Sequence, residues 1–507
     1  MDRLLLPNSH PLPPVSSGLR LILLAVFVVH GMLGAAMGLS VDEAHYALYA
    51  AHPALSYFDH PPLVGWVQWP LVALQAPEAM LRLVPGLLWL ATVAGTYHLT
   101  LRLYGAGAGR DAAGLWAMLA LLLAPLLHIL GIGLLPDTLL MALTVALMHQ
   151  TLTLMESTNP TSIRHWLLLG VLLGLAGLSK YTAIFTALAV AICLLQAQGI
   201  RLLRAPGVWL AALVALLMIS SVLLWNAQNQ WVSFRYQTQH GTGGVWQLQH
   251  VLRFLLVQLV VFGPLLLWGL AGVRPLADRS HQWLVLFFAI PFAVLAYLSG
   301  GGTSLPHWTA PAWVALAPFA GLALGRARQT RWRRPIVGLA ILQGLLCIAL
   351  PALMLTGGIP FVEAKAPASN RAPNPFADLH GWDQAGARAH ALASQRNLSS
   401  VSVQNWTLAS RLGWYARPLK VHVLEDRFDQ FDLWAGDLPE GGDTLLVDWS
   451  EMAYVRPLGA HGFADCQLLE TLAVQRLGRP LSEFRFYACQ GWSGAPQPRL
   501  LSEVTAP

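Results

Sequence analysis

Apolar runs of about twenty residues recur throughout this chain of 507 residues. A helix of that length crosses the ~30 Å hydrocarbon core of a bilayer and satisfies its own backbone hydrogen bonds there. The composition agrees, because 55% of the residues are hydrophobic and only 11% are charged. The sequence therefore predicts a mainly α-helical, polytopic membrane protein. Eleven spans are predicted near residues 20–39, 80–101, 112–132, 136–155, 165–178, 181–199, 207–225, 250–272, 282–299, 309–325 and 335–356.

The placement of arginine orients these spans. Basic residues accumulate in every second loop, and such loops face the cytoplasm. The first apolar run exceeds the roughly 7–15 residues of a signal-peptide core, so an uncleaved span with a cytoplasmic N-terminus is expected. The net charge of +6 fits cytoplasmic loops that contact anionic membrane lipids, and no nucleic-acid partner is expected. The orienting residues are Arg102, Arg110, Arg164, Arg201, Arg204, Arg274, Arg279 and the run RARQTRWRR at 326–334.

The composition changes after Thr356, where a Pro-rich stretch precedes short runs of alternating apolar and polar residues. Such runs are typical of strands. We expect a transmembrane domain over 1–356 with an outer loop at 40–79, a linker over 357–376, and a small soluble periplasmic α/β domain over 377–507. The predicted strands contain SVSVQ (400–404), KVHVL (420–424), TLLVD (444–448) and FRFYA (484–488).

The cysteines divide between these regions. Cys193 and Cys347 lie in apolar runs and are interpreted as small buried hydrophobic residues. Cys466 and Cys489 lie in the soluble region, where they could pair if it is outside the cytosol or remain two buried thiols.

The stretch SVDEAHYALYAAHPALSYFDHPPLVGW at 40–66 is unusually polar for this chain. Ser40 and Glu43 have the spacing of a helix capping box, and Asp42 suits the first turn of a helix. Capping alone could explain Glu43. It does not explain the rest of the stretch, which could be a metal site, an acid/base pair or a hydrated loop. The remaining polar and aromatic residues are His45, Tyr46 and Tyr49 on the face of Asp42, followed by Asp59 and His60 between the helix and two prolines.

Other predicted outer segments also contain isolated ionisable residues. Asp137 follows Pro136 at the start of an apolar helix, where it could be functional or could simply contact the helix dipole. Lys180 interrupts the apolar stretch GLAGLSKYTAIF, and it could bind a lipid phosphate or anchor the chain at the interface. Arg235 and His240 could line an anion site or be solvated, whereas His307 is expected in the aromatic belt.

With these motifs in their order, the chain resembles the bacterial GT-C glycosyltransferases of the protein mannosyltransferase and aminoarabinose (lipid A) transferase group. These enzymes take sugars from polyprenyl phosphates such as undecaprenyl phosphate. The resemblance depends on the ordered set DEAHYALYA, YFDHPP, LLPDTLL, LSKYTA and WNAQNQWVSFRYQ, and in the soluble tail on LHGWDQ and DQFDLW.

The resemblance implies roles for particular residues. Asp42 matches the essential aspartate of the first outer loop, which Glu43 adjoins, and Asp137 matches the acid of the second. Lys180 matches a lysine that contacts the carrier phosphate. The implied catalytic residues are Asp42, Glu43 and Asp137, and the implied ligands of a divalent metal ion are Asp59 and His240. Lys180, His60 and Arg235 are implied at the donor phosphate. The aminoarabinose enzymes carry Lys where His60 stands.

The implied activity is transfer of a hexosyl or pentosyl group from a polyprenyl phosphate to an extracytoplasmic lipid, glycan or protein acceptor by one inverting displacement. In this reaction Asp42 is the base, while Lys180, Arg235 or the divalent cation stabilises the departing phosphate. A transporter or lipid flippase is the alternative, and its ionisable residues should lie near the middle of the membrane. A catalytically silent scaffold is a further alternative.

Overall fold

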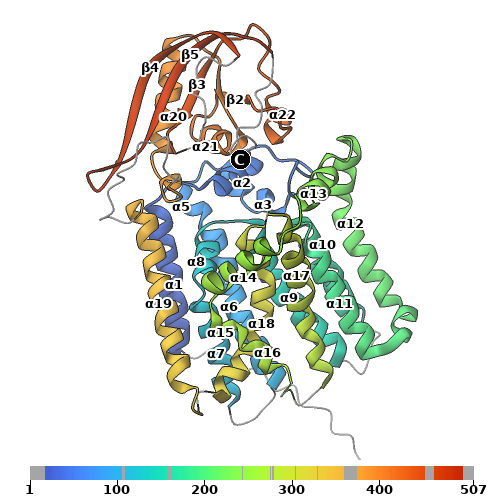
Figure 1. The fold of residues 1–507 in the computed structure, drawn as a ribbon. Helices are drawn as coiled ribbons and strands as arrows, with labels where there is room; N and C mark the ends of the chain where they lie inside the picture. The colour runs from blue at the N-terminus through green and yellow to red at the C-terminus, as the bar shows by residue number, and fades with distance from the viewer. Residues whose placement is uncertain are drawn as a thin grey trace, which may run out of the picture.

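The computed structural model describes residues 17–104, 109–156, 162–242, 244–274, 276, 279–302, 304–327, 329–358, 374–451 and 462–494. Over 239–242 it describes the backbone only. A bundle of long helices bears a small sheet domain on one end (Figure 1). The predicted fold class, mainly α-helical and polytopic with a small C-terminal α/β domain, is confirmed. Of the predicted linker over 357–376, residues 359–373 lie outside the described part.

Each predicted apolar segment coincides with a helix or with a bent pair of helices. The bundle consists of α1 (Ser17–Ala35), α5 (Glu78–Leu81), α6 (Leu83–Tyr104), α7 (Arg110–Leu122), α8 (Pro125–Ile132), α9 (Pro136–Glu156), α10 (Ile163–Ser179), α11 (Ala183–Gln198), η1 (Gly199–Arg204), α12 (Pro206–Gln228), α14 (Leu248–Phe262), α15 (Pro264–Leu267), α16 (Gly269–Gly272), η2 (Arg279–Val285), α17 (Leu286–Leu298), η3 (Ser299–Gly301), η4 (Pro306–Thr309), α18 (Ala310–Ala327) and α19 (Arg333–Thr356).

The number of spans depends on how the bent pairs are treated. Within the described residues, eight helices are long and apolar enough to cross a membrane, and ten are if each bent pair is one span. The bends are 72° between α7 and α8 and 104° between α14 and α15–α16. Proline follows each break, where its missing N–H costs no helical hydrogen bond. Because α10 is apolar but only 17 residues long, the count of eleven stays a prediction.

Helix α18 forms the centre of the bundle. All its residues from Ala310 to Leu322 are buried, whereas α1, α12 and α19 expose large apolar side chains outward. Gly321 of α18 lies against Ala113 and Ala117 of α7, so closely that a Cβ there would overlap the Ala113 carbonyl. Small residues at such contacts let membrane helices approach each other. The bundle is therefore packed around α18, with lipid-facing helices at its edge.

The C-terminal domain contains one mixed sheet in the order β2-β1-β3-β5-β4. Strand β1 pairs in parallel with β2 and β3, while β5 pairs antiparallel with β3 and β4. The four predicted strand runs are confirmed, and β4 was not predicted. The elements are η6 (Ala377–Leu379), α20 (Trp382–Gln395), β1 (Ser400–Val403), α21 (Trp406–Tyr415), β2 (Lys420–Val423), α22 (Gln430–Trp434), β3 (Thr444–Trp449), β4 (Phe463–Arg476) and β5 (Arg479–Trp492).

A disulfide joins Cys466 to Cys489, which face each other in the β4–β5 ladder. Of the two alternatives left open by the sequence, the structure shows the pairing. The two cysteines are 23 positions apart, so the bond closes the hairpin between β4 and β5 into a loop. Such a loop restricts the conformations of the unfolded chain.

The first outer loop belongs to both parts of the molecule. It contains α2 (Val41–Ala51), α3 (Leu63–Trp66) and α4 (Trp69–Ala73), and α2 lies directly beneath α21 in Figure 1. Ala44, Ala47 and Leu48 of α2 join the hydrophobic core of the C-terminal domain. Tyr46 and Tyr49 of α2 instead join the hydrophobic core of the helix bundle. Helix α2 is therefore a buried helix between two domains rather than a helix lying on the membrane surface.

Candidate active site

The structure brings most of the predicted site residues to the end of the bundle that the C-terminal domain covers (Figure 1). They come from separate elements: the first turn of α2, the loop between α2 and α3, the first turn of α9, and the break between α10 and α11. Electrostatic interactions join Asp42 to Asp59, Asp137, Lys180 and a fifth residue, His45. We call these five residues the acidic cluster.

Asp137 and Lys180 form a buried ion pair. The Lys180 ammonium nitrogen Nζ lies 2.7 Å from Oδ1 and 2.6 Å from Oδ2 of Asp137. Lys180 also lies over the ring of Trp308, with Nζ 5.6 Å from its centroid, and Nε2 of His307 lies 3.7 Å from Asp137 Oδ2. Two buried charges need such a partner, because burying either one alone costs several kcal/mol. Lys180 is therefore a buried, paired cation and not an interfacial anchor.

The chain geometry explains why Lys180 can reach Asp137. Helix α10 ends at Ser179, and Lys180 has an extended backbone with φ −158° and ψ 144°. The break turns the lysine side chain inward, away from the lipid, toward the N-terminus of α9. Asp137 in the first turn of α9 is also favourably placed in the helix dipole. From this one position Asp137 can both contact the helix dipole and act as a functional acid.

Asp42 is half-buried. Burial raises the pKa of Asp42 to about 6, while nearby His45 opposes that rise and Asp59 reinforces it. A carboxylate with a pKa just below neutrality is ionised at pH 7 and still basic enough to accept a proton. Its environment therefore suits a general base.

Glu43 is engaged on both carboxylate oxygens. It completes the predicted capping box with Ser40, whose side chain accepts from the Glu43 amide while Glu43 accepts from the Ser40 amide. Arg82 Nε lies 2.7 Å from Glu43 Oε1, and Arg82 Nη2 lies 2.9 Å from Oε2. Arg82 also donates to the carbonyls of Met37 and Gly38. These contacts favour a structural role for Glu43, and the predicted catalytic role stays a prediction.

The surroundings of Asp59 and His60 lower both pKa values, which favours an ionised Asp59 and a neutral His60. Burial alone would raise the pKa of Asp59, but His45 and a hydrogen bond from the Tyr49 hydroxyl hold that pKa well below its usual range. Burial lowers the pKa of His60 to about 4. Nδ1 of His60 has no hydrogen-bond partner among the described residues. A neutral imidazole can donate a hydrogen bond to a phosphate but adds no positive charge, unlike the lysine at this position in the aminoarabinose enzymes.

The remaining predicted residues lie on α13 (Val232–Thr242). Arg235 is exposed there, and the side chain of His240 lies outside the described part. Helix α13 still contacts the site, because Gln237 Nε2 donates to the Asp59 carbonyl at 2.7 Å. Among the described residues, no group of three or more His, Cys, Asp or Glu side chains is arranged to hold a metal ion. Because this statement leaves out the His240 side chain, the predicted metal stays a prediction, and no reaction step is assigned to it.

Sequence reasoning missed Arg82, Ser410 and the contact of His45 with Asp59. It also placed His307 in the aromatic belt, whereas the structure places its Nε2 3.7 Å from Asp137 Oδ2. Arg82 left a signal, since it is a basic residue at the edge of an otherwise acidic outer loop. Ser410 left none, because a serine inside an amphipathic helix is common. Its contact with His45 joins residues 365 positions apart.

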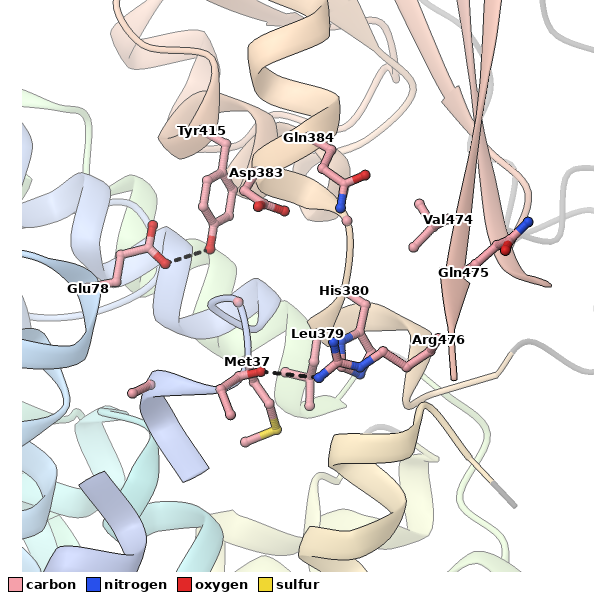
Figure 2. A pocket seen from close by; sticks show the side chains of 14 residues that line it. Met37, Glu78, Leu379, His380, Asp383, Gln384, Tyr415, Val474, Gln475 and Arg476 are labelled. Atoms are coloured by element: carbon pink, nitrogen blue, oxygen red, sulfur yellow. Dashed lines mark hydrogen bonds between the residues drawn. The ribbon is translucent and has the colours of Figure 1, made fainter. Parts of the chain in front are cut away.

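A separate polar pocket of about 300 Å³ lies where the end of α1 meets α20, α21 and β4 (Figure 2). Its side chains hold the two domains together: the Tyr415 hydroxyl donates to Glu78 at 2.9 Å, and Arg476 Nε donates to the Leu355 carbonyl at 3.0 Å. None of the predicted site residues lines it. This pocket is therefore distinct from the acidic cluster.

Comparisons with known proteins agree with the fold. The model of the dolichyl-phosphate-mannose-protein mannosyltransferase family matches residues 59–225, which include Asp59, His60, Asp137 and Lys180. The lipid A galacturonosyltransferase RgtD of Rhizobium johnstonii is 25% identical over 285 residues, or 54% of this chain. The match spans 58% of the length of that relative.

Solved structures match almost the whole chain. ArnT from Cupriavidus metallidurans bound to undecaprenyl phosphate has a TM-score of 0.63 and 18% identity over 95% of this chain and 100% of that one. The apo state of ArnT has a TM-score of 0.57, with 18% identity over 95% and 99% of the two chains. The protein is thus a multi-pass membrane protein with the GT-C glycosyltransferase fold. The predicted resemblance to transferases that use polyprenyl-phosphate sugars is confirmed, and a transporter is not favoured.

Proposed function

We propose that this protein transfers a sugar from a polyprenyl-phosphate carrier to a lipid acceptor at the outer face of a bacterial inner membrane. The observation that carries the proposal is the acidic cluster, which joins a raised-pKa carboxylate to a buried lysine at one end of a GT-C fold. The printed descriptions of the relatives add support. ArnT was crystallised with undecaprenyl phosphate, and RgtD is described as acting on lipid A.

The reaction needs one base and one stabilised leaving group. Asp42 accepts the proton of the acceptor hydroxyl, and that oxygen attacks the anomeric carbon of the donor sugar. The bond from the anomeric carbon to the phosphate oxygen breaks as the new bond forms, and its electron pair leaves with the polyprenyl phosphate. The product is inverted at the anomeric carbon. Lys180 stabilises the developing charge on the phosphate.

Asp137 acts by holding Lys180. Its carboxylate accepts two hydrogen bonds from Nζ, which orients the ammonium group in a buried site. The lysine has three donors, so one is left for a phosphate oxygen while the pair persists. His60 is close enough to interact electrostatically with both residues and would donate a neutral hydrogen bond.

The position of the cluster favours surface chemistry over transport. A polyprenyl phosphate carries its sugar at the membrane surface, and α2, the start of α9 and the α10–α11 break lie at the end of the bundle that faces the C-terminal domain (Figure 1). A transport path would place its ionisable groups near the middle of the spans. We propose a lipid acceptor because the comparison with RgtD supports one, and we keep glycan and protein hydroxyls as alternatives that the assay separates.

Three substitutions test the proposal. Asp42→Asn removes basicity at nearly constant size and should lower transfer by at least ~100-fold.

Lys180→Met should lower transfer by roughly 10- to 1,000-fold, since the substitution removes the cation and keeps the apolar stem. Asp137→Asn should match Lys180→Met, and the double variant should lose little more, because both changes disrupt one pair. Asp383→Asn, an exposed acid on α20, is the matched control and should stay within twofold.

The assay measures transfer from extracted polyprenyl-phosphate sugars to envelope lipids, per amount of monodisperse enzyme. Mass spectrometry of lipids, glycans and proteins from a deletion strain identifies the sugar and the acceptor class. Near-normal turnover by Asp42→Asn would eliminate it as the base. Unchanged polyprenyl-linked sugars and envelope molecules in the deletion strain would argue against a transferase.

A further inference from the structure

We propose that Ser410 of the C-terminal domain is a positioning residue of the active site and acts through His45. This inference rests on the proposed glycosyl transfer. It makes the C-terminal domain a part of the catalytic unit rather than an appended module.

The inference starts from the two ring nitrogens of His45. His45 lies on the same face of α2 as Asp42 and is buried, with 3% of its surface exposed. Its Nδ1 lies 3.0 Å from the Ser410 hydroxyl, and its Nε2 lies 3.6 Å from Asp59 Oδ1. The imidazole thus bridges a side chain of the soluble domain and an acid of the cluster.

The bonding of Ser410 fixes how this bridge is made. The Ser410 hydroxyl donates its own proton to the Trp406 carbonyl one turn earlier, at 2.7 Å. Its oxygen can then only accept at Nδ1, so the hydrogen-bond network assigns a proton to Nδ1 of His45. A flip of the ring would break the hydrogen bond between Nδ1 and Ser410, so this bond favours the orientation in which Nε2 faces Asp59.

The surrounding packing supports the same function. The C-terminal domain places aromatic rings around His45: Trp406 at 5.5 Å, and Phe431 and Trp434 each at 6.1 Å between ring centroids. Buried Gln430 of α22 accepts a hydrogen bond from the Phe58 amide at 2.8 Å, next to Asp59. The domain therefore holds Asp59 from two sides, through His45 and through the backbone that precedes it.

Removing this support should change the chemical step more than the binding of substrates. Asp42 interacts electrostatically with both His45 and Asp59, so a displaced imidazole alters the surroundings of the base. In an active site, a misplacement of about 1 Å can cost up to ~100-fold in rate. Ser410 itself is 0% exposed and reaches the acids of the cluster through His45, so no direct contact with substrate is assigned to it.

Steady-state kinetics of Ser410→Ala test the inference. We expect kcat to fall about 10-fold with KM for the polyprenyl-phosphate sugar within about twofold. Ser410→Thr keeps a hydroxyl that can bond the same carbonyl and should restore kcat to within about threefold. Ser402→Ala is the matched control, since Ser402 is equally buried in the same domain but bonds Thr444. Its kcat per monodisperse enzyme should stay within twofold.

A double-mutant cycle separates positioning from general packing. If Ser410 acts through His45, Ser410→Ala should cost nothing further in a His45→Ala background, whereas an independent packing defect would add. The cycle does not use Ser410→Thr, so it still tests the positioning role if the added methyl group of that variant reduces the folded fraction. A kcat within twofold for Ser410→Ala, or fully additive losses, would overturn the inference and leave the proposed function intact. A wild-type enzyme without transfer would overturn the proposed function itself.

Discussion

Asp42 and Asp59 are carboxylates of the same outer loop with different acidities. Burial raises the pKa of Asp42 to about 6, whereas His45 and the Tyr49 hydroxyl hold the pKa of Asp59 low despite burial. Pairs of acids whose environments separate their pKa values commonly have different catalytic roles. Asp59 stays a constant negative charge over the working range, and Asp42 is the acid that exchanges a proton near neutrality.

The pH dependence of transfer should report this difference. In the proposed reaction Asp42 must be ionised, so kcat/KM should be level above pH 7 and fall below about pH 6, by up to tenfold per pH unit. The sign follows because a raised pKa extends the protonated, inactive form to higher pH. The measurement is kcat/KM between pH 5 and 8, with the monodisperse fraction checked at each pH. An acid limb near pH 4 would assign the base to a carboxyl with an ordinary pKa.

The elements that position these residues depend on a few buried contacts at helix ends. Helix α2 is short, and its direction is set by the capping box and by Arg82, which joins Glu43 to the last residues before α2. A buried ion pair of this kind contributes little compared with an apolar pair, but breaking it leaves an unpaired charge. The break between α1 and α2 is therefore sensitive to the loss of one partner.

Arg82→Met should destabilise the protein by about 3 kcal/mol or more, because it leaves Glu43 buried and unpaired. Adding Glu43→Gln should recover part of that loss. Thermal unfolding in detergent measures both, and Arg102→Met is the matched control. Arg102 forms a partly exposed pair with Glu156 at 2.7 Å, whose loss should cost about 1 kcal/mol or less.

The same variants decide the role of Glu43. If Glu43 is structural, Glu43→Gln should lose folded protein but keep transfer within about threefold per folded molecule. A loss of ~100-fold per folded molecule, with normal thermal stability, would instead support the predicted catalytic role.

On the scale of the whole molecule, the acidic cluster lies at the end of the bundle, where the C-terminal domain contacts it through Ser410. The bundle supplies Asp137 and Lys180, the outer loop supplies Asp42, His45 and Asp59, and the C-terminal domain closes the site from above (Figure 1). This arrangement requires the C-terminal domain and the outer loop to lie on one side of the membrane. The Arg-rich loop before α19 should lie on the other side.

Labelling with a membrane-impermeant thiol reagent tests this topology. In a variant whose free cysteines Cys193 and Cys347 are replaced by alanine, Arg396→Cys should react in intact spheroplasts. Gln329→Cys, in the Arg-rich loop, should react only after permeabilisation. Both positions are exposed in the structure, so a lack of labelling could not be due to burial of the cysteine. The reverse pattern would overturn the predicted orientation.

The features determined by the sequence alone are those that depend on neighbours along the chain. Apolar runs predicted the long helices of the bundle, and alternating apolar and polar residues predicted four strands. The spacing of Ser40 and Glu43 predicted a capping box. Hydrophobic burial and local hydrogen bonds act within one element, so their pattern can be read from its residues. The bends after α7 and α14, and strand β4, escaped prediction because packing against other elements determines them.

The tertiary structure alone decided which polar groups are partners. Lys180 pairs with Asp137 over 43 positions, Arg82 with Glu43 over 39, and Ser410 with His45 over 365. The energy of such a pair depends on a separation of about 3 Å and on the exclusion of water, and both are set by how distant helices pack. The sequence thus pointed to Asp42, Asp59, Asp137 and Lys180 as members of one site. Only the folded chain showed that Asp137 holds Lys180, that Arg82 engages Glu43, and that the C-terminal domain reaches the site, because these contacts exist only once the two domains have come together.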